Sequence, residues 1–447
     1  FVSGFAPLTE DNQPISLVSD AQIEKIKGNG AFGEVAAVFV EECSRPAGLI
    51  LLVCGLAAFG YLLIETFRLA KIPRERMFVV LILTFFSLLF WAFFEQAGSS
   101  INLFTDRNVD RIAEASHVEE ADVGEPIYFR VVVAEKDDDL KELDLLTQEQ
   151  FGYVNDSPEA AAELEAAIRA VENDKTEGKK TEEELDELVE DLAGQEAFTM
   201  THLTYLRNAA GLDDAPEDAK TYDWIVTKEN VGMGVGGSEV PASAFQSLNP
   251  IYIVIFGLLF TMLWGFLAKK NIEPSTPVKF SFGLLQLGLG FVALWYGAVN
   301  ADPRGMAVMS CLLLGYLLHT TGELCLSPVG LSMVAKLSPK RLVSTVMGAW
   351  LLASAFSMFL SAIIAQFTGV SHGGEGDAVG IPVPTETIGA YGSVFGKVAI
   401  AALISALICF LLAPFLKRWM HEGLDDDGNP EVAHDEEPVA AGAEEEA

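Results

Sequence analysis

The stretch that decides the fold is FWAFFEQAGSSINLF, residues 90–104. It completes an apolar run that begins near Met77. At about 1.5 Å of helix per residue, this run is long enough to cross a bilayer with some tilt. A carboxylate, Glu95, lies two-thirds of the way along it. Because a carboxylate inside a spanning helix costs about 2.5 kcal/mol or more, such a residue normally faces a bundle interior or a water-filled cavity.

Polar residues recur around Glu95 at helical spacing. Trp91, Glu95, Ser99 and Asn102 follow one another at intervals of four, four and three residues, which places them on one face of a helix. The remaining positions are mostly Phe, Leu and Ile, which suit lipid or neighbouring helices. The pattern predicts a polar stripe that runs through the membrane.

The rest of the chain alternates between apolar runs and acidic stretches. Half of the residues are hydrophobic, yet the formal net charge is −34. Such acidity argues against binding of nucleic acid. The fold class we predict is an all-α membrane protein, with seven spans at residues 48–67, 77–104, 242–267, 280–299, 305–334, 342–367 and 391–416.

These spans divide the chain into five parts. In order, we expect a polar N-terminal segment (1–46) that is a loop or disordered, two spans (47–106), an acidic extracytoplasmic insert (107–240), five spans (241–418) and a disordered acidic tail (419–447). Within the insert, the sequence predicts a strand at 126–133, helices at 157–172, 181–194 and 197–208, and a flexible Gly-rich linker at 232–237. The insert is thus expected to be a small α+β or helical appendage; a largely disordered loop is the alternative.

Basic residues near the span ends predict the orientation. The Lys and Arg clusters at 68–76, 269–270, 336–341 and 417–418 fall on one side if every span crosses once. The positive-inside rule makes that side cytoplasmic. We therefore expect a multi-pass protein of the inner (plasma) membrane, with its C-terminus in the cytoplasm and its insert in the periplasm or outside. Arg107 and Arg111, just past the second span, are the exception.

Two motifs resemble a known family. WAFFEQAGSSINLFTDR (91–107) and GELCLSPVGLSM (322–333) resemble the seventh and tenth transmembrane helices of the proton-coupled oligopeptide transporter family, within the major facilitator superfamily. The resemblance implies that the last six spans are the C-terminal six-helix bundle. The first span would match the second of two extra helices that bacterial members carry between the halves. The N-terminal half would be missing, and its ExxERFxYY motif does not occur in the sequence.

This resemblance also implies a function. We expect proton-coupled symport of di- and tripeptides by alternating access, with peptide, protons, the bilayer and the missing N-terminal half as partners. Two alternatives remain: a major facilitator transporter of another small substrate, and a membrane-anchored binding or scaffold protein that acts through the insert. The sequence shows no nucleophile–base pattern, phosphate loop or metal motif, so we expect neither an enzyme nor a cofactor.

Two carboxylates are the central site predictions. By the resemblance, Glu95 faces the cavity and serves proton coupling and gating by pairing with a Lys of the other half; the alternative is a helix-end carboxylate that reaches water. Glu323 and Ser327 lie one turn apart, and Pro328 frees the carbonyl of Leu324. Carboxylate, hydroxyl and kink make a site for an ammonium group, and the resemblance implies the peptide amine. The alternative is a structural kink with Glu323 near the membrane boundary.

Three further residues complete the predicted site. The resemblance places Asn249 inside a helix and in contact with peptide, whereas the local pattern Asn249-Pro250 is typical of a helix N-cap. It makes Trp350 a wall of a side-chain pocket, although a Trp at that position also suits an interfacial anchor. His319 lies four residues before Glu323, where it either titrates with transport or serves as a structural hydrogen-bond partner.

Overall fold

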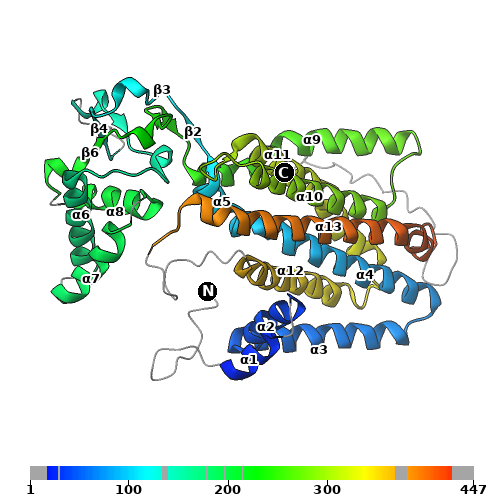
Figure 1. The fold of residues 1–447 in the computed structure, drawn as a ribbon. Coiled ribbons are helices and arrows are strands. Elements are labelled where there is room, and N and C mark those ends of the chain that lie inside the picture. Colours follow the sequence, from blue (N-terminus) through cyan, green and yellow to red (C-terminus); the bar gives the residue numbers. More distant parts are fainter. Residues whose placement is uncertain are drawn as a thin grey trace, which may run out of the picture.

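The computed structural model consists of a helical bundle with a smaller unit at one end (Figure 1). It describes residues 18–28, 31–132, 139–176, 180–195, 197–213, 215–367 and 380–424. Residues 1–17 of the predicted polar segment and residues 425–447 of the predicted disordered tail lie outside the described residues.

Seven helical segments in the described part of the chain are long and apolar enough to cross a membrane: Gly48–Arg68, Lys71–Asn108, Ala242–Lys269, Thr276–Val299, Met309–Leu337, Val343–Gln366 and Pro384–Trp419. The predicted all-α membrane bundle, with an insert between the second and third spans, is confirmed. The helices that form these spans are α3 (Pro46–Arg68), α4 (Lys71–Phe94), α5 (Ser100–Asn108), α9 (Leu248–Lys269), α10 (Thr276–Val299), α11 (Met309–Leu337), α12 (Val343–Gln366) and α13 (Pro384–Trp419).

The N-terminal segment differs from its prediction. Two stretches that were expected to be part of a loop or disordered segment form helices, α1 (Asp20–Lys27) and α2 (Ala31–Ser44). Ser19 begins α1, and its backbone N–H donates to Gln22 Oε1 over 3.2 Å, which is half of a capping box. The glycines of this region had favoured a loop, but Gly28 ends α1 and so separates the helices.

The second span is interrupted where a continuous helix was predicted. α4 ends at Phe94, a 3₁₀ turn η2 (Glu95–Gly98) follows, and α5 begins at Ser100. Gly98 and the two serines after it are weak helix formers, which explains a break at this point. The residues of the predicted stripe are all half-buried, although the break means that they do not share the face of one regular helix.

Two glycines bring α10 and α11 together at the depth of the predicted site. A Cβ on Gly283 would lie 2.9 Å from the carbonyl oxygen of Gly322, and one on Gly322 would lie 2.7 Å from that of Gly283. Neither position accepts a side chain without displacing the partner helix. The contact fixes the backbone immediately before Glu323.

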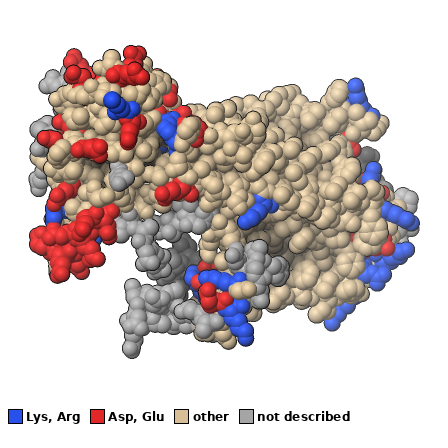
Figure 2. All heavy atoms as spheres, viewed as in Figure 1, with Lys and Arg blue, Asp and Glu red and all other residues tan. Residues whose placement is uncertain are grey.

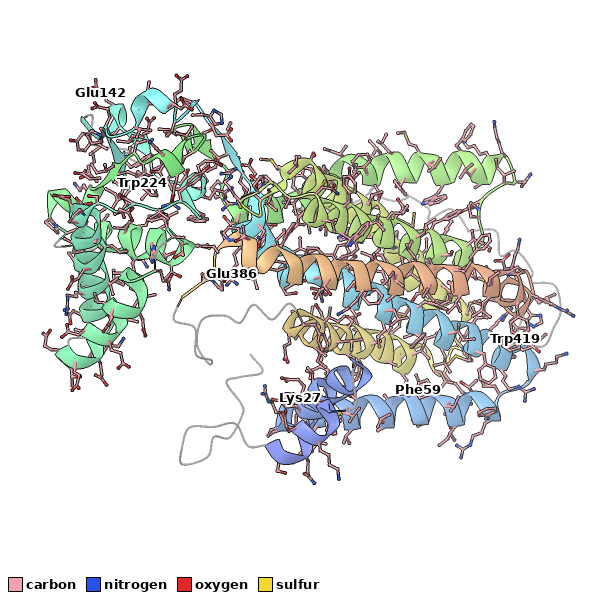
Figure 3. All side chains as sticks on the ribbon, in the orientation of Figure 1. Lys27, Phe59, Glu142, Trp224, Glu386 and Trp419 are labelled. Atoms are coloured by element: carbon pink, nitrogen blue, oxygen red, sulfur yellow. The ribbon has the colours of Figure 1, made fainter. Side chains whose placement is uncertain are left out.

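Two outer helices of the bundle, α9 and α3, leave apolar side chains exposed. α9 has no buried residue, and Val254 on it is 78% exposed. The outer side of α3 is similar: Figure 3 shows Phe59 there, and its side chain is 53% exposed. Apolar surfaces of this size are suited to lipid or to another membrane helix.

The insert is folded over its described residues as an α+β unit. Strand β4 (Pro126–Arg130) pairs with β5 (Asp144–Leu145) in parallel and with β6 (Thr221–Ile225) in antiparallel orientation. Around this sheet lie α6 (Pro158–Thr176), α7 (Glu182–Ala193) and α8 (Met200–Ala210). Phe129 and Trp224 are fully buried in the core between them; Figure 3 labels Trp224. The short 3₁₀ turns are η3 (Glu120–Asp122), η4 (Asp139–Glu142), η5 (Gln148–Gln150), η6 (Glu217–Lys220), η7 (Lys228–Asn230) and η8 (Ala242–Ser247).

A two-stranded stalk joins the insert to the bundle. We define the stalk as residues 109–118 and 233–240. In it, β2 (Ile112–Ala113) pairs with β8 (Ser238–Glu239), and β3 (Ser116–His117) pairs with β7 (Gly234–Val235), both antiparallel. At its base, β1 (Val109–Asp110) pairs in parallel with β9 (Ala307–Val308) from the loop between α10 and α11. The prediction of a flexible linker at 232–237 is wrong, because most of these residues form ladder hydrogen bonds or tight turns.

Gly237 provides a test of the stalk. Its φ is +94°, and a Cβ there would lie 1.9 Å from the carbonyl oxygen of Ala113. Gly237→Ala is therefore expected to destabilise the stalk by about 1–3 kcal/mol, through strain and a clash with the backbone. Gly232 is the control, because its φ is +92° but nothing lies within 4 Å of an added Cβ. Thermal unfolding of the purified chain should show the larger loss for Gly237→Ala; equal losses would mean that the clash is relieved.

Candidate functional site

The structure brings Glu323 and Asn249 into direct contact. Glu323 lies near the middle of α11, and Asn249 near the start of α9. Asn249 donates from Nδ2 to Glu323 Oε2 over 3.0 Å and to Thr320 Oγ1 over 3.1 Å. Thr320 is fully buried and in turn donates to the carbonyl of Tyr316 over 2.8 Å. Glu323 itself is half-buried, so its other oxygen remains within reach of a ligand.

The surroundings of Asn249 decide between its two interpretations. The turn η8 (Ala242–Ser247) leads directly into α9, whose N-cap is Ser247. Asn249 therefore lies inside the helical segment and turns its side chain across to α11, so the N-cap interpretation is wrong. The remaining interpretation is that the Asn249 amide fixes the position of the Glu323 carboxylate within the helical bundle.

A cavity of about 170 Å³ is lined by Asn249 and Thr320 of this hydrogen-bonded group. Its walls come from the second, third and fifth spans: Phe94, Ala97, Gly98, Gln246, Asn249, Tyr316, His319 and Thr320. The lining combines aromatic surface with amide, hydroxyl and imidazole groups, a mixture that suits a small polar ligand.

Glu95 begins the 3₁₀ turn in the second span, and Ala97 and Gly98 of the same turn line the cavity. Its side chain is half-buried, and its carboxylate makes no hydrogen bond or ion pair with the residues that the structure describes. A partly buried carboxylate without a partner is costly in a membrane. The position is therefore one where a cation or a proton from elsewhere would be stabilising.

His319 lies on the cavity wall in an aromatic cage. Its ring centroid is 4.7 Å from that of Phe291 and 6.4 Å from that of Phe94. A Cβ on Gly290 would lie 2.4 Å from its Cδ2, so the ring fills the space above that glycine. Tight packing fixes the imidazole at this place, and its titration with transport stays a prediction.

Trp350 and Ser327 are not joined to the Asn249–Glu323 pair. Trp350 is only 7% exposed and packs on Gly330, where a Cβ would lie 2.7 Å from its Cη2. Burial between helices argues against the interfacial anchor, and a role as a pocket wall stays a prediction. Ser327 is half-buried and makes no hydrogen bond with the described residues.

Sequence reasoning missed two polar contributors. Gln96 is fully buried: its Nε2 donates to Ser361 Oγ over 2.8 Å, and its Oε1 accepts from Ser100 Oγ over 2.6 Å. This network ties the 3₁₀ turn to α12. Thr320 was missed although it lies three residues before Glu323, on the same helix face, and that spacing was the available signal.

The comparisons with known proteins place part of the chain in a family. Residues 221–377 match the model of the POT family. Dipeptide and tripeptide permease B of Aeromonas hydrophila is 35% identical over 193 residues, which are 43% of this chain and 37% of that protein. The uncharacterized transporter YclF of Bacillus subtilis is 36% identical over 204 residues, 46% of this chain and 37% of that protein.

The matches cover only part of each relative. The chain spans less than two-fifths of the length of these two relatives. A crystal structure of a peptide transporter POT in complex with sulfate is 19% identical with a TM-score of 0.46, covering 90% of this chain and 55% of that one. The predicted resemblance is confirmed at the level of sequence: residues 221–377 of this multi-pass membrane protein match the model of the POT family, and its relatives include peptide permeases.

Proposed function

We propose that this chain forms the C-terminal half of a proton-coupled symporter for di- and tripeptides that works by alternating access. The observation that carries the proposal is the hydrogen bond between Asn249 and Glu323, with Asn249 on the wall of a small cavity inside a membrane bundle. The POT family region and the peptide permeases among the relatives support the substrate class. An enzyme is not proposed, because the family consists of transporters.

The chemistry of a peptide suits this arrangement. A di- or tripeptide is a zwitterion with variable side chains, so its constant features are an ammonium group at one end and a carboxylate at the other. Glu323, held by Asn249, offers a preoriented charge for the ammonium group. Ser327 and Trp350 are proposed to line the site beside it, on the same helix as Glu323 and on the neighbouring α12.

A second bundle is part of the proposal. Transporter sites of this type lie between two related halves. Glu95 has no partner among the described residues, and α9 presents an apolar surface without a buried residue. An N-terminal half would cover such a surface and supply a cation for Glu95, together with the cations that bind the peptide carboxylate.

The charge distribution supports an orientation. Figure 2 shows Lys and Arg gathered at the end of the bundle away from the insert, whereas the insert is rich in Asp and Glu. The positive-inside rule makes the basic end cytoplasmic. We propose that the protein lies in the inner membrane, with its C-terminus in the cytoplasm and its insert on the opposite side of the membrane.

Uptake of labelled dipeptide tests the proposal, and Glu95→Gln sharpens the test. In the complete transporter in proteoliposomes, an inward proton gradient is expected to drive accumulation. Glu95→Gln should reduce driven uptake to the undriven level, because the group that changes its protonation or pairing is lost. Peptide affinity and counterflow should stay within a few-fold of wild type. Loss of affinity equal to the loss of driven uptake would place Glu95 in the binding site instead.

A groove in the insert keeps one alternative open. It has a volume of about 730 Å³ and is lined by α6, by the end of α8 and by residues between 211 and 221, with small apolar side chains beside the acidic residues Glu163, Asp174 and Asp213. A binding or scaffold protein that acts through the insert would use this groove. The uptake experiment separates the two: complete absence of dipeptide transport by the complete protein would favour the insert. Transport of another amine-bearing solute in preference to dipeptides would favour the second alternative.

A further inference from the structure

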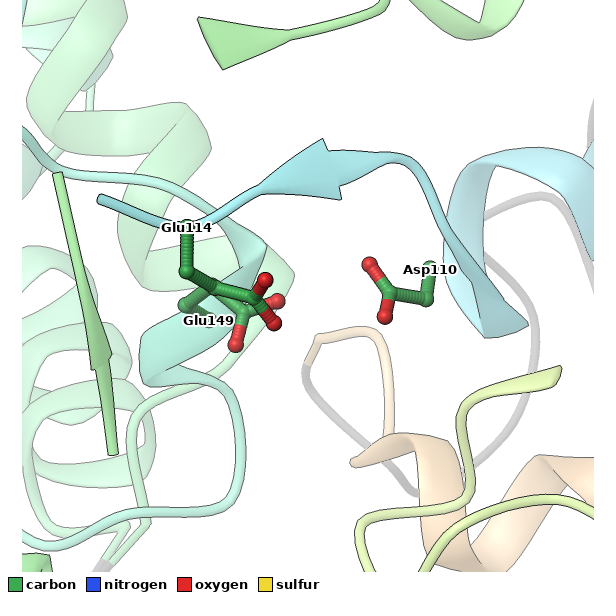
Figure 4. A group of neighbouring side chains, drawn as sticks. All are labelled: Asp110, Glu114 and Glu149. Carbon is green, nitrogen blue, oxygen red and sulfur yellow. The ribbon is translucent and has the colours of Figure 1, made fainter. Parts of the chain in front are cut away.

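Two carboxylates of the stalk and a third one 35 residues further along the chain meet at the base of the insert. Asp110 ends β1, Glu114 lies in the stalk, and Glu149 belongs to η5 in the insert. One oxygen of each lies within 4.8 Å of the others. Figure 4 shows the carboxylates of Glu114 and Glu149 together, with that of Asp110 turned toward them across a short gap.

One oxygen in this cluster has an open bonding position deep inside the protein. Glu149 is 2% exposed. Its Oε2 accepts from Arg304 Nη1 over 2.5 Å, but its buried Oε1 has no hydrogen-bond partner. A buried carboxylate oxygen left unpaired costs free energy, which is why nearly all such atoms in native proteins are satisfied. The observation points to a missing partner rather than to a solvated acidic surface.

The surrounding charges are not balanced. Arg304 is shared between Glu149 and Asp302, to which it donates over 2.9 Å. Four carboxylates and one guanidinium sum to −3. The site thus disfavours its own negative charges unless further positive charge is present.

We propose that Asp110, Glu114 and Glu149 bind a hard divalent cation of the calcium class, which fastens the insert to the membrane bundle. The spacing fits: oxygens that share one calcium ion at 2.3–2.6 Å lie at most about 5 Å apart. The donor set consists of carboxylates without Cys or His, which favours calcium or magnesium over zinc. The unpaired Oε1 of Glu149 supplies a ligand that no protein group occupies.

The position of the cluster explains what the ion would do. Asp110 and Glu114 belong to the stalk and Glu149 to η5 of the insert, while Arg304, which bonds Glu149, comes from the loop between α10 and α11. A cation here would join the insert to the part of the stalk that pairs with the bundle through strands of two residues each. The proposal is independent of what the bundle transports.

Calcium titration of the purified full chain, after removal of metal with a chelator, tests this site. We expect saturable binding with a Kd of about 1 mM or tighter and a rise in the unfolding temperature. Asp110→Asn combined with Glu114→Gln should raise the Kd at least about tenfold and remove the thermal shift, because two of three charged ligands are lost. Magnesium titrated alone reports on selectivity.

The control must distinguish calcium binding at this site from nonspecific attraction of calcium to an acidic protein. Glu183→Gln combined with Glu187→Gln removes the same charge from exposed positions on α7 and should leave the Kd unchanged. Equal weakening by both pairs, or no saturable binding of calcium in the wild type, would overturn the proposal. Should the double variant not fold, Glu114→Gln alone decides, since this half-buried residue makes no hydrogen bond within the described chain. An unchanged Kd for calcium in Glu114→Gln would likewise contradict the proposed site.

Discussion

Glu323→Gln is expected to weaken dipeptide binding to the complete transporter by about 1.5–3 kcal/mol, which is about 10- to 150-fold in Kd. Glutamine keeps the shape of the side chain and can still accept from Asn249, so the variant removes the negative charge and little else. A charge-assisted hydrogen bond to the peptide ammonium group becomes a neutral one. The effect should disappear for an analogue in which the amine is replaced by hydrogen, since that ligand never made the bond.

Isothermal titration with a dipeptide and with its des-amino analogue measures the difference directly. Glu386→Gln is a matched control: this acidic residue is exposed at the start of α13, next to the insert (Figure 3). It should leave both affinities unchanged. A Glu323→Gln variant that binds the dipeptide as well as wild type does would show that this carboxylate does not hold the amine, and would leave it the structural role of bonding Asn249.

The helices that cross the membrane could be predicted because their signal is composition over twenty residues. All seven runs of apolar sequence became spans, with ends that moved by a few residues. The break in the second span could not be found this way. It rests on Gly98 and on the buried bonds of Gln96 to Ser361, a partner 265 positions away. Helical periodicity has no access to such a contact.

The insert shows the same division. Its three helices and its central strand followed local patterns and appeared close to the predicted residues. The stalk did not follow its predicted pattern. Gly234 and Gly237 allow neighbouring groups to approach the backbone closely, and they do not form a flexible linker. A Cβ on Gly234 would lie 2.6 Å from Glu149 Oε2. A glycine in a sequence is compatible with a flexible linker and with close packing of the backbone, and the neighbouring strand in the structure distinguishes the two.

The candidate site was predictable in its chemistry but not in its pairing. Glu323 stood out as a carboxylate in an apolar run, and Asn249 stood out through the resemblance. Neither position indicated that one would bond the other across two helices at 3.0 Å. The acidic cluster was harder to predict: four strands of the described chain, β2 to β5, lie between Asp110 and Glu149, and the meeting of the two residues depends on how the insert docks.

Arg111→Met is expected to loosen the insert from the bundle by about 3 kcal/mol. The Arg111 side chain is 4% exposed and donates to both sides of the joint. Toward the second span it bonds the carbonyls of Thr105 (2.9 Å) and Asp106 (3.2 Å), and toward the stalk it bonds the carbonyl of Val240 (2.6 Å) and Glu239 Oε1 (3.1 Å). Methionine fills similar volume and leaves these acceptors without a donor.

Hydrogen exchange of the stalk amides, together with thermal unfolding of the chain, measures this loss. Adding Glu239→Gln to Arg111→Met should recover part of it, because a carboxylate that has lost one of its cations is then removed. Among the described residues, Arg207 at 2.9 Å is the cation that Glu239 keeps. Arg169→Met on α6 is the control, since Arg169 pairs with acids on the exposed surface of the insert. Exchange of the stalk amides at the wild-type rate in Arg111→Met would show that Arg111 does not hold the stalk to the bundle.

The same contacts explain why a basic residue is tolerated at the end of the bundle opposite the Lys and Arg clusters. Arg111 is buried and bonded to Glu239 and to backbone carbonyls. It is therefore unlike the exposed charges by which the positive-inside rule sets orientation.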